Sequence, residues 1–427
     1  MLLLNELKQN KIIGSIFSFG SVTLLSSFLS FIVGVLTRNL LGPEIYGYWL
    51  TISMVFPFLG LLQFGTLNAM NREVPYYLAR NEDKKVEEIR SLTFSFMFSV
   101  PLISMFVLFA SSIFLLFFNI DIEYKIGIFA TTFIGVLTFL SGYIEMYYKS
   151  NQEFKTASRL IFIKSISQSV LTLIFVYVMG YTGLYIGMIL SLIIQVIFGR
   201  GSFRKVKLEF YNEKYKELIR IGFPILLVGL IWSLMIASDR IIISLFMTPV
   251  DMGNYGVGIL VFSTMMLFPQ VIGQVFYPKI VELVSKNNYE EIRRLSWKVN
   301  KIIAILLGLV VLIGYLTLPF LITWLMPEYV KGIKAAQILI LGIYPLTLVG
   351  FAANYFNSTH NQKTYMYIQI TAIIVNIMLC MIFLLYSKSI EFIALGTSLA
   401  NLVYCILMNN FFYKKLNENM KTPNSHL

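Results

Sequence analysis

A few charged side chains stand inside long apolar stretches of the sequence, and their chemistry narrows what the protein can do. Asp239 and Arg240 lie between two apolar runs, residues 236–238 and 241–246, each of which contains one serine. A charge at the centre of a bilayer costs about 2.5–3.5 kcal/mol on insertion scales, so it usually faces a partner or a wet cavity. We therefore expect both residues to be buried, either in a ligand-binding role or as a purely structural ion pair.

Lys164 begins a polar stripe on a predicted helix. Gln168 and Thr172 follow it at intervals of four residues, which places all three side chains on one helix face. A hydrophilic stripe with a cation suits an anionic ligand in a water-filled cavity. The alternative is a lysine that extends its side chain to the cytoplasmic side of the membrane.

Two further charges complete the set of candidate site residues. Glu145 lies near the end of the predicted helix 126–148, where it can receive a proton or an ion, or pair with Arg159 or Lys164. Arg38 lies at the end of the first predicted helix. Its long side chain can face a cavity or reach the membrane interface.

The rare residues offer little material for catalysis or for metal binding. Cys380 and Cys405 both lie in apolar runs, and His360 and His426 are the only two histidines. The sequence has no Cys-x-x-Cys, no Cys/His cluster and no Gly-x-x-x-x-Gly-Lys-Ser/Thr motif. It therefore lacks the pattern of a zinc site, a disulfide framework or a P-loop ATPase. We expect no enzyme and no cofactor.

The composition places these residues in a membrane protein. Hydrophobic residues make up 57% of the 427, and charged residues make up 13%, about half the share in soluble proteins. A membrane-spanning helix needs about 20 mostly apolar residues, so the apolar share suffices for about twelve helices. A soluble globular protein and a disordered chain are excluded, and the long unbroken runs argue against a transmembrane β-barrel.

Twelve apolar runs are long enough to cross a bilayer, so the sequence predicts an all-α polytopic membrane protein with twelve transmembrane helices. The first six runs cover residues 12–37, 46–65, 92–118, 126–148, 160–179 and 184–199. The second six cover residues 219–239, 255–277, 299–323, 335–356, 365–386 and 392–413.

Lysine and arginine fall mainly on one side of these helices. With a cytoplasmic N-terminus, about 27 of the 34 basic residues lie in cytoplasmic segments, which is the positive-inside pattern. The net charge of +12 then reflects this sorting and contact with anionic lipid headgroups, so we expect no nucleic acid partner. Both termini are predicted to be cytoplasmic. The first helix is too long for a signal peptide and is expected to be retained.

The sequence also predicts where helices lie flat and where they bend. Segments 80–90, 208–220 and 286–298 mix both charge signs at helical spacing, which predicts amphipathic helices on the cytoplasmic surface. Prolines inside predicted spans are candidate bend points. They are Pro57, Pro224, Pro269, Pro319 and Pro345.

The two halves of the chain repeat one another in an ordered series of matches. The matched segments are Tyr46-Gly47 with Tyr255-Gly256, residues 87–90 with 290–293 (both Glu-Glu-Ile-Arg), Asn151-Gln152 with Asn361-Gln362, and Gly187 with Gly396. Six helices are an even number, so both halves start on the same side and are related in parallel. The predicted bundles, residues 1–204 and 205–427, face each other across a central cavity, as in many transporters.

Three stretches carry a resemblance to a known family. They are Arg38 to Gly47, which contains Leu-Gly-Pro-Glu-Ile-Tyr-Gly, then Asp239-Arg240, and the Gly-Asn-Tyr that follows at 253–255. In them the chain resembles the Wzx-type lipid-linked oligosaccharide flippases. These form the polysaccharide-export branch of the multidrug/oligosaccharidyl-lipid/polysaccharide exporter superfamily. The resemblance extends over the whole chain in length, helix count and repeat.

The resemblance implies a substrate, a route and partners. The substrate is a polyprenyl-diphosphate-linked oligosaccharide, an O-antigen or capsule repeat unit, moved from the cytoplasmic to the outer leaflet of the bacterial inner membrane by alternating access. The implied partners are a coupling ion (H⁺ or Na⁺), the lipid bilayer and a polysaccharide polymerase complex. The predicted substrate-binding residues are Arg38, Lys164, Asp239 and Arg240, and the predicted ion-coupling or pairing residues are Glu145 and Asp239.

Two rival functions stay open at this stage. An ion-coupled exporter of small drugs from the same superfamily would bind cations and favour an acidic cavity, whereas the candidate residues are mostly basic. A membrane-embedded glycan polymerase or acyltransferase usually needs a large outer loop or a catalytic His or Arg/Asp pair. No predicted outer connector exceeds about a dozen residues.

Overall fold

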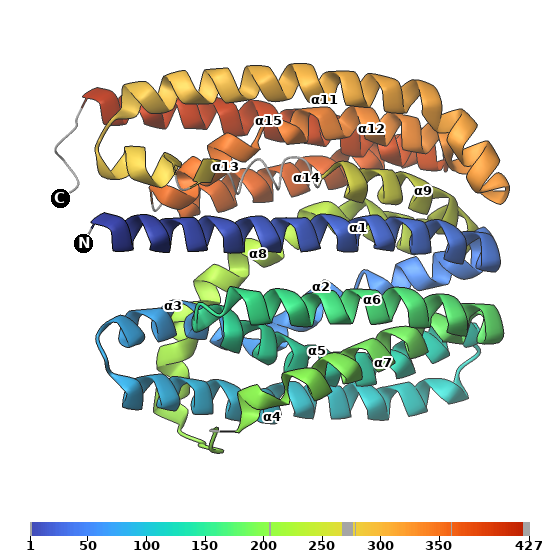
Figure 1. Ribbon diagram of the computed structural model, residues 1–427. Coiled ribbons are helices and arrows are strands. Elements are labelled where there is room, and N and C mark those ends of the chain that lie inside the picture. Colours follow the sequence, from blue (N-terminus) through green and yellow to red (C-terminus); the bar gives the residue numbers. More distant parts are fainter. Residues whose placement is uncertain (1, 205, 267–275, 278, 360, 422–427) are drawn as a thin grey trace. The chain divides into compact units, whose positions relative to one another are not determined.

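The structure is a computed structural model, and the residues that it describes are almost all helical (Figure 1). These residues are 2–204, 206–266, 276–277, 279–359 and 361–421; the side chains of 2–24 and of 212 are not described. The chain folds as two compact units. Unit 1 comprises Met1–Leu41 and Tyr48–Leu230, and unit 2 comprises Gly42–Gly47 and Ile231–Leu427.

Unit 1 is built on a bundle in which α6 and α7 pack along each other, α5 packs against α7, and α4 packs against α5 (Figure 1). Its elements are α1 (Leu2–Ser53), α2 (Phe56–Leu59), η1 (Gly60–Gln63), α3 (Thr66–Ala79), α4 (Asp83–Phe114), η2 (Leu115–Phe117), α5 (Ile122–Ser150), α6 (Phe154–Met179), α7 (Tyr181–Gly199), η3 (Arg200–Phe203) and the first part of α8 (Asn212–Phe246). Apolar side chains of α3, α4 and α5 form a buried core that includes Met70, Val74 and Tyr143.

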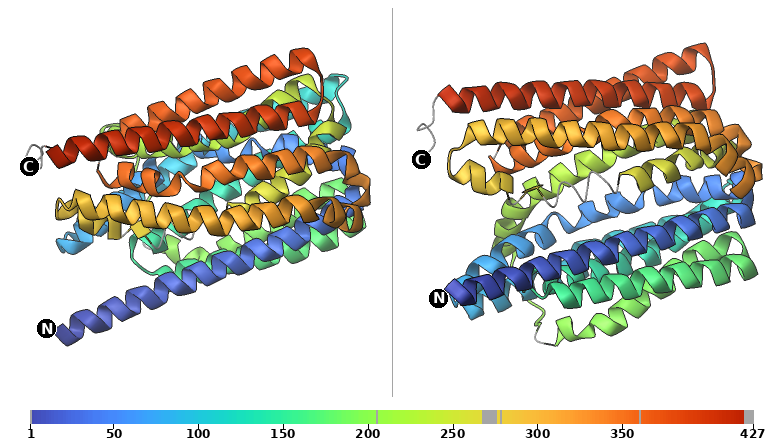
Figure 2. Two further views of the ribbon diagram at one scale, coloured as in Figure 1. Left: turned by 90° about the horizontal axis from the view of Figure 1, so that it is seen from above. Right: turned by 45° about the horizontal axis from the view of Figure 1, so that its top comes forward.

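Unit 2 is centred on α15, against which both α12 and α14 pack (Figure 2). Its elements are the last part of α8, α9 (Pro249–Met265), α11 (Tyr289–Leu325), η4 (Pro327–Gly332), α12 (Ile333–Thr347), α13 (Gly350–Ser358), α14 (Gln362–Tyr386) and α15 (Ile390–Lys421). α12 also contacts α9 and α11. The predicted bundle boundary at residues 204 and 205 stays a prediction, because α8 belongs to both units.

The helices confirm an all-α polytopic membrane protein. Within the described residues, nine helices are long and apolar enough to cross a bilayer. The segment η4–α12 and the helix α13, which meet at a bend of 40°, are long and apolar enough only when taken together, and they raise the number to ten if the pair is one span. One of the nine, Leu25–Gln63, contains two predicted spans, and the predicted span 255–277 continues from α9 into residues that are not described. Every predicted span therefore falls at least partly on an observed helix.

The three predicted surface helices are not separate elements. Residues 83–90, 212–220 and 289–298 are instead the first turns of α4, α8 and α11, and each of these helices continues directly into an apolar span. In α4 and α11 no glycine or proline lies within eight residues after the charged segment, and α8 continues as a helix through Gly222 and Pro224. α3 is an additional helix that the sequence reading did not predict.

The bend points follow the prolines only in part. Pro57 lies in α2, just after α1 ends, and Pro345 lies in α12 close to the bend before α13. Pro224 and Pro319 are inside the continuous helices α8 and α11, and Pro269 lies outside the described residues. A break that was not predicted occurs inside α1 at Gly42, which adopts φ 71° and ψ 170°. A side chain rarely tolerates this positive φ, and glycine does.

Residues 42–47 make a close backbone contact with the start of α9 inside unit 2. A Cβ on Gly47 would lie 1.8 Å from the Pro249 oxygen, and a Cβ on Gly253 would lie 1.7 Å from the Pro43 oxygen. The two segments share the pattern Pro-x-x-x-Gly, at 43–47 and at 249–253, with an offset of 206. The match of Tyr46-Gly47 with Tyr255-Gly256 stays a prediction.

The later marker of the repeat behaves as predicted. A Cβ on Gly187 of α7 would lie 2.6 Å from the Thr172 backbone of α6, and one on Gly396 of α15 would lie 2.9 Å from Cys380 Sγ of α14. Each glycine thus lets the last helix of its half approach the helix before it. The 209-residue offset of this pair marks equivalent positions.

Candidate functional site

Asp239 is a buried carboxylate near the end of α8, in unit 2, and only 6% of it is exposed. The hydroxyl of Tyr255, on α9, donates a hydrogen bond to its Oδ2 at 2.5 Å. The backbone N–H of Arg240 donates to its Oδ1 at 2.7 Å. Both carboxylate oxygens therefore have donors, as a buried charge requires.

A second layer of polar side chains from α14 and α15 surrounds this carboxylate. The Ser238 hydroxyl donates to Asn376 Oδ1 at 3.2 Å. The Cys380 thiol lies one turn further along α14, with its sulfur 3.6 Å from the same oxygen and 3.9 Å from the Thr397 hydroxyl. The close approach at Gly396 brings the two helices together here. The cluster joins four helices, α8, α9, α14 and α15, through buried polar groups.

Arg240 lies on the wall of a small cavity beside this cluster. Its guanidinium donates to the Ile236 carbonyl oxygen at 3.1 Å. The cavity has a volume of about 30 Å³, and Asp239, Arg240, Thr397 and Asn401 give it a polar side. A space of this size holds about one or two water molecules. Among the described residues no Lys or Arg side chain forms an ion pair with Asp239, so the purely structural ion pair with Arg240 is not observed.

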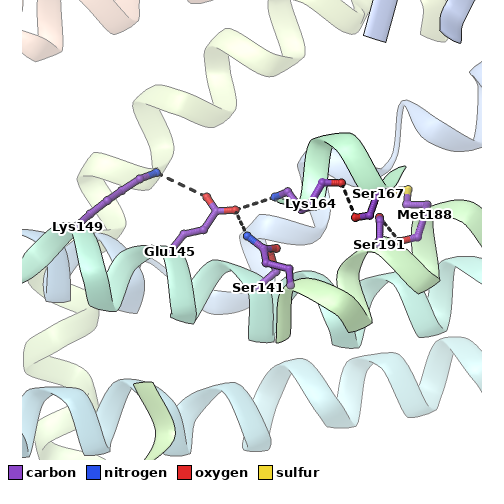
Figure 3. A network of polar contacts seen from close by, with 8 residues as sticks. Ser141, Glu145, Lys149, Lys164, Ser167, Met188 and Ser191 are labelled. Carbon is purple, nitrogen blue, oxygen red and sulfur yellow. Dashed lines mark hydrogen bonds and ion pairs between the residues drawn. The ribbon is translucent and has the colours of Figure 1, made fainter. Parts of the chain in front are cut away.

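Unit 1 carries the other polar network, centred on Glu145 of α5 (Figure 3). Lys164 Nζ of α6 lies 2.7 Å from Glu145 Oε1, and Lys149 Nζ lies 3.6 Å from Oε2. Gln195 Nε2 of α7 donates to Oε1 at 2.9 Å, and Ser141 donates to the other end of the same amide. Of the two partners considered for Glu145, the structure selects Lys164.

Arg38 is 3% exposed and lies in α1, one turn before the break at Gly42. Its guanidinium donates to the Gly34 carbonyl oxygen at 2.8 Å. Burial of this cation agrees with a place inside the protein and not at the membrane interface. Its role in substrate binding stays a prediction.

The structure thus brings Glu145 and Lys164 together inside unit 1, whereas Asp239 and its sequence neighbour Arg240 lie in unit 2 without an ion pair between their side chains. Sequence reasoning missed Tyr255, Gln195, Asn376 and Thr397. A signal was available for two of them. Asn376 belongs to a stripe of polar residues along α14, and Thr397, Asn401 and Tyr404 follow one face of α15 at helical intervals.

No metal centre emerges in the part of the chain that the structure describes. No group of three or more His, Cys, Asp or Glu side chains lies close enough there to hold a metal ion. The acidic groups of the two polar networks, Asp239 and Glu145, each lie singly among hydroxyl, amide or ammonium donors.

A comparison with protein families decides where the chain belongs. The model of the polysaccharide biosynthesis protein family matches residues 12–284, which is more than half of the chain. The chain belongs to this family. No curated protein matches it.

Solved structures extend the comparison to nearly the whole fold of this family member. A multidrug resistance MATE family transporter of the MOP superfamily, in an inward-facing conformation, superposes with a TM-score of 0.76 at 14% identity, over 93% of this chain and 96% of that one. The lipid II flippase MurJ gives 0.72 at 17% identity, over 94% and 90%. A point mutant of the Vibrio cholerae MATE transporter VcmN gives 0.67 at 14% identity, over 96% and 98%. The predicted fold is confirmed.

Proposed function

We propose that the protein is a flippase that moves a polyprenyl-diphosphate-linked oligosaccharide from the cytoplasmic to the outer leaflet of the bacterial inner membrane. Membership of the polysaccharide biosynthesis protein family supports the substrate class, and the fold shared with a lipid II flippase supports the reaction. The site observation that carries the proposal is Arg240, a cation beside Asp239 in the apolar part of α8, where it lies on the wall of a cavity. Both termini are cytoplasmic in this proposal.

The chemistry of the substrate explains the need for such cations. A diphosphate carries about two negative charges, and moving it unpaired through hydrocarbon costs far more than thermal energy. The planar guanidinium of Arg240 can replace water around the phosphate with a bidentate hydrogen bond. Arg38 and Lys164 are the further cations predicted to bind the substrate, and both lie in unit 1.

Asp239 has the role of a coupling residue in this proposal. Its buried carboxylate is hydrogen-bonded to Tyr255 and lies beside a cavity large enough for water or for a small cation such as Na⁺. Binding or release of H⁺ or Na⁺ there would change the charge next to Arg240, and so the affinity for an anionic ligand. Glu145 is assigned to pairing, because Lys164 already neutralises it.

The test is complementation of a deletion strain, with chemical analysis of the glycan on the lipid carrier. The deletion should accumulate the lipid-linked oligosaccharide in the inner leaflet. Arg240→Lys should restore export partly, and Arg240→Glu should not restore it, although both are present in the membrane as folded protein. Arg294→Glu reverses an exposed charge on α11 and should restore export fully. Full export by Arg240→Glu, or no accumulation of the lipid-linked oligosaccharide in the deletion strain, would contradict the proposal.

A second candidate function is ion-coupled export of small molecules. The likeness to a multidrug resistance transporter favours it, as does a buried carboxylate near the end of α8. Under this alternative the deletion strain would become sensitive to cationic drugs and its surface polysaccharide would be unchanged. Co-purification with a polysaccharide polymerase would speak for the flippase, because a polymerase uses the flipped repeat unit.

A further inference from the structure

A groove of about 290 Å³ lies in unit 2 between the first turns of α11 and the last turns of α15. Eight residues line it: Trp297, Asn300, Lys301, Ala304, Leu348, Cys405, Asn409 and Tyr413. It is distinct from the cavity beside Asp239, with which it shares no lining residue.

Two tryptophans fix the depth of the groove in the membrane. Trp297 and Trp324 are 65% and 72% exposed, and the stretch 302–323 of α11 between them carries no charge. At 1.5 Å per residue, the 27 residues between them span about 40 Å, which matches a bilayer with its headgroup regions. Exposed tryptophans mark the two membrane interfaces. The groove, which begins at Trp297, therefore lies at the level of the headgroups.

α15 reaches the same interface from the opposite direction. It runs antiparallel to α11, and Asn409 and Tyr413 come just before its basic end at Lys414 and Lys415. The two helices that form the groove, α11 and α15, thus carry their charged residues on the same side of the membrane. This is the side that holds most of the basic residues of the chain.

The lining residues of the groove include one cation, Lys301. The Lys301 ammonium lies 5.9 Å from the centre of the Trp297 ring, and the described residues that line the groove include no carboxylate. A cation without an acidic partner in the groove suits a phosphate group. Asn300 adds an acceptor, because its Oδ1 is buried and has no hydrogen-bond partner among the described residues. Such an oxygen suits a ligand that also carries a hydroxyl donor.

The surface next to the groove suits hydrocarbon chains. Directly beyond Lys301, α11 exposes Ile302, Ile305 and Leu306, each about half exposed or more. α15 exposes Leu402 and Ile406 at the corresponding depth. A ligand with a polar head in the groove would thus continue onto an apolar surface, as a phospholipid does.

We propose that this groove binds the headgroup of an anionic phospholipid of the basic-side leaflet. The phosphodiester lies against Lys301, a hydroxyl of a glycerol headgroup donates to Asn300 Oδ1, and the acyl chains follow α11. Phosphatidylglycerol carries both features. The site is independent of the transport function proposed above and can be tested without transport.

The test uses Trp297 as a reporter of lipid contact. The three other tryptophans, Trp49, Trp232 and Trp324, are replaced by phenylalanine, and the protein is placed in phosphatidylcholine vesicles with a small fraction of brominated lipid. Brominated phosphatidylglycerol should quench Trp297 at about one-fifth of the concentration that brominated phosphatidylcholine requires. The attraction of one basic side chain to anionic lipid, about 1 kcal/mol, corresponds to a preference of about this size. Lys301→Gln should abolish this preference, and Lys301→Arg should keep it.

Lys298→Gln is the matched control, since Lys298 is exposed on the same turns of α11 but does not line the groove. It should leave the preference intact. Equal quenching by the two lipids, or equal losses in Lys298→Gln and Lys301→Gln, would overturn the site in favour of general surface charge. Displacement of brominated phosphatidylglycerol by equimolar polyprenyl diphosphate would overturn it in favour of the transport substrate. If the tryptophan-depleted protein fails to fold, native mass spectrometry can compare the unaltered chain with Lys301→Gln. The unaltered chain should retain more bound phosphatidylglycerol than phosphatidylcholine, and Lys301→Gln should retain both equally.

Discussion

Gly222 of α8 packs directly on the backbone of Gly65, the residue before α3. A Cβ placed on Gly222 would lie 1.8 Å from the Gly65 carbonyl oxygen, and one on Gly65 would lie 2.3 Å from the Gly222 carbonyl carbon. Gly65 also adopts a positive φ of 84°. Two main chains touch here without any side chain between them, and the contact fixes the first half of α8 in unit 1.

Gly222→Ala should therefore destabilise the protein. The methyl group has no space, and the backbones must separate, at a cost of about 1–3 kcal/mol typical of overpacking. Thermal unfolding in detergent measures the loss. Gly229→Ala is the control on the same helix, because a Cβ at Gly229 meets no atom within 4 Å. It should be neutral or stabilise by up to about 1 kcal/mol, as alanine favours helix. Equal melting temperatures for the two variants would contradict the contact.

Glu145 and Lys164 should be energetically coupled. Their side chains are 18% and 26% exposed, so water screens the pair only partly. We expect a coupling free energy of about 1–2 kcal/mol in a double-mutant cycle with Glu145→Gln and Lys164→Met. The exposed pair Glu213 and Lys216, 85% and 71% exposed, should give less than about 0.5 kcal/mol in the same cycle. Similar values for both pairs would show that the buried network contributes no more than a surface contact.

Thr248 should stabilise the start of α9. Its hydroxyl accepts a hydrogen bond from the Asp251 N–H at 3.3 Å, and the Asp251 carboxylate accepts one from the Thr248 N–H at 3.1 Å. Loss of this capping box in Thr248→Ala should cost about 1 kcal/mol, whereas Thr248→Ser should cost little. The melting temperatures of both variants check this. A serine variant as unstable as the alanine variant would show that the methyl group, not the cap, matters.

Ser95 should hold the connector that precedes α8. Its hydroxyl accepts a hydrogen bond from the Glu209 N–H at 2.7 Å, and the Ser91 hydroxyl accepts one from the Lys207 N–H at 3.2 Å. Removal of one such bond costs about 0.5–1.5 kcal/mol, so Ser95→Ala should speed tryptic cleavage after Lys207 about two- to tenfold. Ser99→Ala is the control, since the Ser99 hydroxyl bonds only within α4 among the described residues. An equal cleavage rate in both variants would show that the Ser95 hydrogen bond does not hold the connector in place.

The sequence by itself determined the class of protein, its spans and the few charges worth following. These features are local, since a run of apolar residues long enough to cross a bilayer and a charge inside that run are visible without any knowledge of folding. The charged starts of α4, α8 and α11 show the limit of local reading. Their composition indicates an interface, but only the continuous backbone shows that they begin transmembrane helices.

Tertiary structure decided which groups meet. Tyr255 and Asp239 are 16 residues apart in the chain, and Ser238 and Asn376 are 138 apart, so no periodicity links them. The choice of Lys164 over Arg159 as the partner of Glu145 depends on how α5 and α6 pack. The close contact of the two Pro-x-x-x-Gly segments, at 43–47 and 249–253, was visible only in the tertiary structure. Sequence spacing fixes which residues share a helix face, whereas the packing of glycine against a neighbouring backbone fixes which faces come together.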